Sequence, residues 1–197
     1  MMRKVDMDES KARKIYETYQ YANNALGHFI SEIKSSPLGE KTIISASGDH
    51  RLREYSISFP EDLGTAHSVP FYLYVPDNIL KHTNYKYQAN RIGSHRDIFP
   101  TLYAFSLSNA KYTSLGGRNL LAVNDIPEPY AHNNGVTLTN AGASYASNST
   151  TLYPWKNSND LTVNKQGIPN LTPNLDIEHQ KLQTLYINAE IKGFQSN

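Results

Sequence analysis

The residues best suited to chemistry are an adjacent aspartate and histidine, Asp49 and His50, in the run Gly48-Asp49-His50. This run follows residues 42–47, a short β-branched segment bounded by turn residues, which predicts a buried strand. Neighbouring side chains point to opposite faces within a strand, but on an irregular loop beyond it both can reach one ion. A carboxylate with a neutral imidazole suits Zn or Mn. The pair therefore predicts a metal site, and the alternative is an aspartate that caps a turn beside a surface histidine.

Two more histidines and two arginines lie at the predicted ends of neighbouring elements. His67 directly precedes a second predicted strand, where it could face the same crevice as the Asp-His pair. His95 and Arg96 lie at a predicted helix start, and a helix N-terminus beside an arginine favours an anion such as phosphate. Arg51 follows the Asp-His pair directly and could also pair with a phosphate. The alternatives are histidines exposed on loops and surface arginines balanced by nearby acidic residues.

The elements that must position these side chains follow an α/β order. The sequence predicts an amphipathic helix over residues 9–35, strands over 42–47 and 69–75, and a helix over 97–107. This order is typical of parallel strands with helices packed across the sheet. Ligands of such sheets bind outside the carboxyl ends of the strands, which is where Asp49 and His50 are predicted. The apolar residues of the first helix recur at spacings of three and four: Ile15, Tyr19, Ala22, Leu26, Phe29, Ile30 and Ile33.

The sequence changes character past Gly116-Gly117. Short apolar runs separated by Asn, Gly, Pro and Ser predict a small antiparallel sheet, and Asn140-Ala141-Gly142 indicates a hairpin within it. A last helix is predicted over residues 176–192, with Gly193 as its C-terminal cap. The predicted strands are residues 119–123, 136–139, 143–146, 151–155 and 161–163.

Composition excludes several classes of protein. The chain has 197 residues and no cysteine, so it holds no disulfide, thiolate zinc site or cysteine nucleophile. A net charge of +1 argues against a strong nucleic-acid binder, and we expect no nucleic-acid partner. No apolar run is long enough to cross a bilayer, so we expect this chain itself to be soluble.

Six segments in order resemble the sulfatase-type domain of the lipoteichoic acid synthase and phosphoglycerol transferase family, within the alkaline phosphatase superfamily. The resemblance covers roughly residues 10–125, and more loosely the region to about residue 165. The segments are residues 21–30 (YANNALGHFI), 42–44 (TII), 48–50 (GDH), 67–71 (HSVPF), 93–103 (GSHRDIFPTLY) and 115–116 (LG).

The resemblance implies a fold and a set of site residues. The fold is α/β: a partial alkaline-phosphatase-like sheet with flanking helices, a small antiparallel β subdomain and a C-terminal helix. Residues 1–117 would be the C-terminal part of the catalytic domain, and residues 118–197 a small sheet and closing helix of the same domain. By resemblance, Asp49 and His50 hold a divalent metal, Mn or Zn. His67 and His95 are candidate catalytic residues that could protonate a leaving alkoxide, with Arg51 and Arg96 as substrate-binding candidates.

The implied function is part of a metal-dependent phosphoglycerol transferase or sulfatase-like enzyme. Such an enzyme acts on phosphate or sulfate esters in cell-envelope glycolipid or glycan synthesis, with a phospholipid or glycan as substrate. The family's nucleophile segment matches no part of this chain, so we expect the chain alone to be inactive and to need the N-terminal half of the catalytic domain. The parent protein would be membrane-anchored, with an extracytoplasmic catalytic domain. The alternative is a non-catalytic fragment or regulatory binding module, and an exposed sheet edge could support a homodimer.

Overall fold

The computed structural model describes residues 8–51, 53, 57–87, 91–107, 110–112, 117–122, 130–171, 182, 184–185, 187–189 and 191–193. Contacts divide the chain into two compact units. Unit 1 is Met1–Ser58 with Ser68–Thr83, and unit 2 is Phe59–His67 with Asn84–Asn197. The predicted division at residue 117 concerned two parts of one catalytic domain and stays a prediction.

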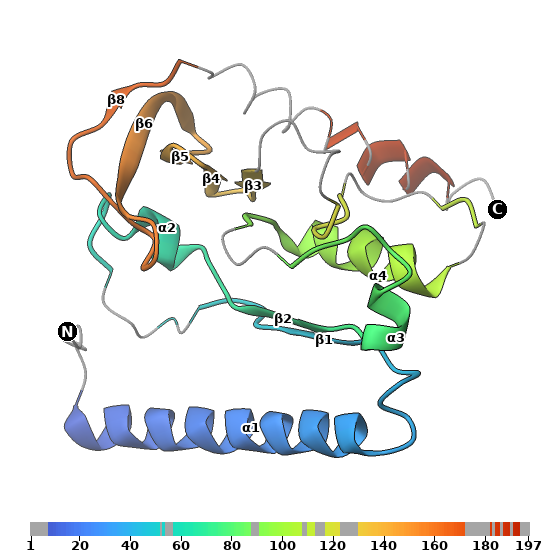
Figure 1. Cartoon of the computed structure of the whole chain (residues 1–197). Coiled ribbons are helices and arrows are strands. Elements are labelled where there is room, and N and C mark those ends of the chain that lie inside the picture. The colour runs from blue at the N-terminus through green and yellow to red at the C-terminus, as the bar shows by residue number, and fades with distance from the viewer. Residues whose placement is uncertain are drawn as a thin grey trace. The chain divides into compact units, whose positions relative to one another are not determined.

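Unit 1 begins with helix α1, Glu9–Ser35, which confirms the helix predicted over residues 9–35 (Figure 1). Asp8 caps its start by accepting a hydrogen bond from the Lys11 backbone N–H at 3.2 Å. The N–H of Ser36 donates to the Ile33 carbonyl at 3.1 Å, and Pro37 follows, so the helix ends there. Both ends are thus determined locally by the residues that flank the helix.

The two strands of unit 1 are antiparallel, so the predicted parallel arrangement is wrong. Strand β1, Ile44–Ser47, pairs with β2, Phe71–Tyr74, and Ser47 lies opposite Phe71. A parallel pair needs a crossover, usually through a helix. In the described residues between the two strands, the only helix is the four-residue α2, Leu63–Ala66, which belongs to unit 2. The carboxyl end of β1 therefore lies beside the start of β2, and a short helix α3, Asp77–Leu80, follows β2.

Helix α1 contacts the β1–β2 sheet with one side of its C-terminal half. Ile30 is its only buried residue among those described. The Lys34 ammonium lies 4.6 Å from the centre of the Tyr74 ring. An open groove of about 480 Å³ runs beside this contact and is lined by Leu26, Ile30 and Tyr72 among others. The predicted amphipathic helix is confirmed, but most of its apolar residues stay exposed.

Unit 2 contains the predicted small antiparallel sheet, in the order β3-β4-β5-β6-β7, with β8 paired to β6. Strands β3 to β6 and β8 are labelled in Figure 1. The hairpin predicted at Asn140-Ala141-Gly142 joins β4 and β5. The strand predicted over 119–123 is not formed in its described part, because residues 119–122 make a turn closed by the Ala122 N–H and the Asn119 carbonyl. The strands are β3 Tyr130–His132, β4 Val136–Thr139, β5 Gly142–Tyr145, β6 Asn148–Asn157, β7 Thr162–Val163 and β8 Ile168–Pro169.

The core of unit 2 lies between this sheet and helix α2. Leu63 of α2 is fully buried with Val136 and Val163. Gly64 lets α2 pass close to the backbone of Leu161, since a Cβ on Gly64 would lie 2.5 Å from the Leu161 carbonyl oxygen. Trp155 borders the core and donates its indole N–H to the Thr139 carbonyl at 2.9 Å. A four-residue helix is thus held in place by tertiary packing.

The helix predicted over residues 97–107 forms in unit 2 as a 3-10 turn η1, His95–Asp97, followed by α4, Ile98–Ser106. The described residues from 182 to 193 are helical, which agrees with the predicted last helix. Gly193 is itself helical, so it is not the residue beyond the helix end that was predicted. Among the helices of the described residues, none combines the length and apolar character needed to cross a membrane.

Glu61 makes ion pairs with two lysines of unit 2, and these predict which lysine has the larger effect on the Glu61 pKa. Its carboxylate lies 3.0 Å from Lys156 and 3.5 Å from Lys165. The hydrogen bond from Lys156 is the largest cause that lowers the Glu61 pKa below its ordinary value. A lowered carboxyl pKa stabilises the fold above the unfolded pKa, and this is lost as pH falls through the folded pKa. We expect Lys156→Met to raise the Glu61 pKa, measured by NMR titration of the carboxyl carbon, more than Lys165→Met does. A larger rise of the Glu61 pKa in Lys165→Met than in Lys156→Met would contradict this prediction.

Candidate functional site

The loop after β1 turns sharply against the residues that precede β2. Ser47 donates its hydroxyl to the carbonyls of Gly48 at 3.0 Å and Pro70 at 3.2 Å. The Gly48 N–H also donates to Pro70. A Cβ on Gly48 would lie 3.3 Å from the Val69 Cβ, so glycine lets the chain pass close to that side chain. These contacts, all within unit 1, present Asp49 and His50 on the surface.

Asp49 and His50 point toward each other across this loop. His50 Nε2 lies 3.3 Å from Asp49 Oδ2, and the two side chains are 52% and 87% exposed. The His50 backbone N–H donates to Asp49 Oδ1 at 2.9 Å. That N–H is the largest cause that lowers the pKa of the Asp49 carboxyl below its ordinary value. Asp49 is therefore a carboxylate at neutral pH, with Oδ2 directed at the imidazole.

The geometry of the pair fits two ligands of one metal ion. His50 Nδ1 lies 2.7 Å from the Arg51 carbonyl oxygen. A carbonyl only accepts, so Nδ1 carries a proton in this contact, and in a neutral ring the lone pair is on Nε2, facing Asp49. The same 3.3 Å separation is that of an ion pair if the imidazole is protonated. Two ligands of a tetrahedral Zn, each near 2.1 Å from it, lie about 3.4 Å apart.

Arg51 is half-buried and turns back on its own loop. Its Nη1 atom donates to the Arg53 carbonyl at 3.4 Å. The backbone carbonyl of the same residue accepts the His50 ring N–H, so Arg51 fixes the tautomer of the histidine. Its predicted role in binding a phosphate stays a prediction.

His67 belongs to unit 2, apart from the unit that contains Asp49 and His50. It ends α2, is exposed, and its ring lies against Gly135, where a Cβ would be 2.7 Å from His67 Cε1. The structure thus describes His67 beside the β3–β4 turn, and its catalytic role stays a prediction.

His95 and Arg96 form the η1 turn in unit 2, and the anion at this turn is the chain's own Asp97. The Asp97 carboxylate accepts the Ser94 backbone N–H at 2.7 Å, which completes a capping box. His95 is exposed. Burial lowers the pKa of Arg96, and neighbouring Asp97 opposes that shift. Their predicted roles toward a substrate stay predictions.

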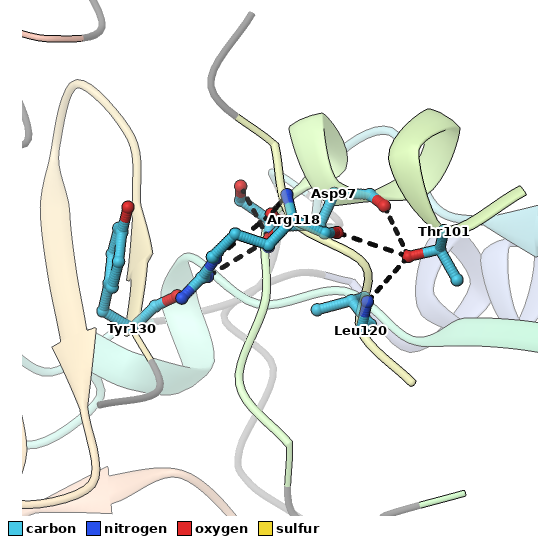
Figure 2. A network of polar contacts seen from close by, with 6 residues as sticks. Asp97, Thr101, Arg118, Leu120 and Tyr130 are labelled. Atoms are coloured by element: carbon cyan, nitrogen blue, oxygen red, sulfur yellow. Dashed lines mark hydrogen bonds and ion pairs between the residues drawn. The ribbon is translucent and has the colours of Figure 1, made fainter. Parts of the chain in front are cut away.

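Asp97 is the centre of a buried polar network that the sequence analysis did not identify (Figure 2). The carboxylate is 1% exposed and accepts the Arg118 backbone N–H at 2.7 Å. The Arg118 guanidinium pairs with it at 3.3 Å, lies 3.9 Å from the centre of the Tyr130 ring and donates to the Tyr130 carbonyl. Figure 2 shows Arg118 extending from Asp97 to Tyr130. One arginine thus connects η1 to strand β3.

Thr101 extends the network into α4. Its hydroxyl is fully buried, donates to the Asp97 carbonyl at 2.6 Å and accepts the Leu120 N–H at 2.9 Å (Figure 2). Gly117 lets its backbone pass close to the backbone of Arg96, because a Cβ on Gly117 would be 1.8 Å from the Arg96 carbonyl oxygen. The pattern Ser94-x-x-Asp97 is a sequence signal for the cap, but nothing in the sequence links Asp97 to Arg118. The network positions the segment His95–Asp97.

No family model, curated protein or solved structure matches this chain. In the part of the chain that the structure describes, no three His, Asp or Glu side chains gather into a group that could hold a metal ion. Asp49 and His50 therefore form a pair with no third such ligand among those residues, and the Mn or Zn site stays a prediction.

Proposed function

We propose that this chain is a portion of a metal-dependent phosphoglycerol transferase or sulfatase-like enzyme that acts on phosphate or sulfate esters. The observation that carries the proposal is the Asp49–His50 pair, with Oδ2 and Nε2 3.3 Å apart on the surface. The order of segments that resembles the sulfatase-type domain is the second support.

Asp49 and His50 would hold the ion, Mn or Zn. A divalent ion bound there would polarise a phosphoryl or sulfuryl oxygen and lower the pKa of a hydroxyl nucleophile. Asp49 supplies the charge, since its carboxyl is ionised at neutral pH. The Arg51 carbonyl keeps the His50 ring oriented with Nε2 toward the carboxylate. His67 and His95 remain the predicted proton donors, and Arg51 and Arg96 the predicted contacts to the ester anion.

Titration of Mn and of Zn into the chain tests the pair directly. We expect Asp49→Ala to weaken binding of the preferred ion by at least about tenfold, because even outer partners of metal ligands contribute that much. Isothermal titration calorimetry gives the affinity for each ion.

Asp77→Ala is the matched control, because Asp77 is an exposed carboxylate in the same unit. Equal affinities in Asp49→Ala and the unsubstituted chain would refute the ligand assignment. The same would follow if Asp77→Ala weakened binding as much as Asp49→Ala.

One observation favours the second candidate function, a binding module without turnover. Two protein ligands alone hold an ion weakly, and no third His, Asp or Glu joins them among the described residues. Metal binding that depends on Asp49, without hydrolysis of a phosphodiester by the same sample, is the result that both candidates predict for this chain alone. Turnover by the 197-residue chain alone would exclude the second candidate.

A further inference from the structure

Helix α1 presents a line of apolar residues whose spacing alternates between three and four, which we call the heptad stripe. This alternation averages about 3.5 residues, the repeat of helices that pair as coiled coils. It runs through most of the 27 residues of the helix. The heptad stripe is Ala12, Ile15, Tyr19, Ala22, Leu26, Phe29 and Ile33.

Three large members of the heptad stripe are exposed, while Ile15 and Ile33 are half-buried. Tyr19 is 48% exposed, Leu26 41% and Phe29 56%. The β1–β2 sheet packs instead on the neighbouring side of the helix, where Ile30 is buried and Lys34 covers the Tyr74 ring. An exposed, regular apolar line of this length is typical of an interaction surface.

We propose that the heptad stripe binds the same stripe of a second copy of this chain, with the two α1 helices antiparallel. In that alignment two of the large residues face alanines, and the third pair joins two large residues. Phe29 lies opposite Ala12 of the second copy, Tyr19 opposite Ala22, and Leu26 opposite Ile15. A parallel pair would place Phe29 against Phe29, Tyr19 against Tyr19 and Ala22 against Ala22, which fills the interface unevenly. The fit is therefore self-complementary, as a two-fold symmetric interface requires.

The charges that flank the heptad stripe match the same alignment. Lys11 and Glu32 are both exposed, near opposite ends of the helix and on the side of it away from Ile30. In the antiparallel pair, Lys11 of each copy lies beside Glu32 of the other, which makes two ion pairs across the interface. The two alanine pairings and the flanking charges thus favour a second copy as the occupant. This inference rests on α1 alone and not on the proposed function.

Sedimentation equilibrium of the full chain and of two variants tests the proposal. We expect the unsubstituted chain to be a dimer and Leu26→Glu to be a monomer, because the substitution buries two charges in the stripe. Tyr21→Glu is the matched control, since Tyr21 is 78% exposed on another side of α1, and it should remain a dimer. Circular dichroism confirms that α1 stays helical in each variant.

A charge exchange then tests the orientation. Lys11→Glu should weaken the dimer by about tenfold at low salt, because two attractions become repulsions. The double variant Lys11→Glu/Glu32→Lys should restore the original affinity. A monomeric unsubstituted chain would overturn the proposal, and so would a Leu26→Glu dimer, because its interface would lie away from the heptad stripe. Failure of the double variant to recover would overturn the antiparallel alignment.

Discussion

Replacing Asp97 by alanine is expected to lower the free energy of unfolding of unit 2 by about 3–5 kcal/mol. The carboxylate is 1% exposed and accepts the backbone N–H groups of Ser94 and Arg118. Without it, both N–H groups lose their acceptor, and the Arg118 guanidinium, whose side chain is 18% exposed, loses its counter-charge. Urea denaturation followed by Trp155 fluorescence measures the loss. Trp155 is the only tryptophan in the sequence and lies in unit 2.

Two further variants show whether the charge pair is the cause. Asp97→Ala/Arg118→Met should recover part of the lost stability, because it removes the unpaired guanidinium and keeps its apolar stem. Asp77→Ala removes an exposed carboxylate in unit 1 and should leave the Trp155 transition within about 0.5 kcal/mol of the original. A loss below about 1 kcal/mol in Asp97→Ala would contradict the buried network.

Leu63→Ala is the second substitution with a large expected effect, a loss of about 2–5 kcal/mol. Leu63 is fully buried and packs in the core with Val136, Ala143 and Val163. Truncation leaves a cavity between α2 and the sheet, and α2 has only four residues, too few to be stable without this contact. The same urea transition of Trp155 measures the effect, because Trp155 borders this core.

Leu171→Ala is the matched control in the same unit. Leu171 is 93% exposed, so the identical truncation removes almost no burial and should change the transition by less than about 0.5 kcal/mol. Equal losses in the two variants would show that α2 does not pack on the sheet as described.

Several elements could be predicted because their signals are local. Helix α1 has an apolar repeat, a capping Asp8 and a terminating Ser36-Pro37, so its bounds follow from neighbouring residues. The β4–β5 hairpin follows from the turn residues Asn140-Ala141-Gly142 for the same reason. The direction of β2 relative to β1 could not be predicted, because it depends on the path of the chain between them. That path passes through unit 2 and carries only a four-residue helix among the described residues.

The candidate site, too, could be predicted only where its signals are local. The sequence by itself determined that a carboxylate and an imidazole are adjacent at a strand end, and that Ser94 and Asp97 have capping spacing. Only the tertiary structure decided that Arg118 pairs with Asp97 across 21 positions of sequence, whereas the contacts among Asp49, His50 and Arg51 are local to one loop. The physical reason is that spacing along a chain sets which groups are near in sequence. Burial and pairing between distant residues depend on how the backbone returns to bring them together.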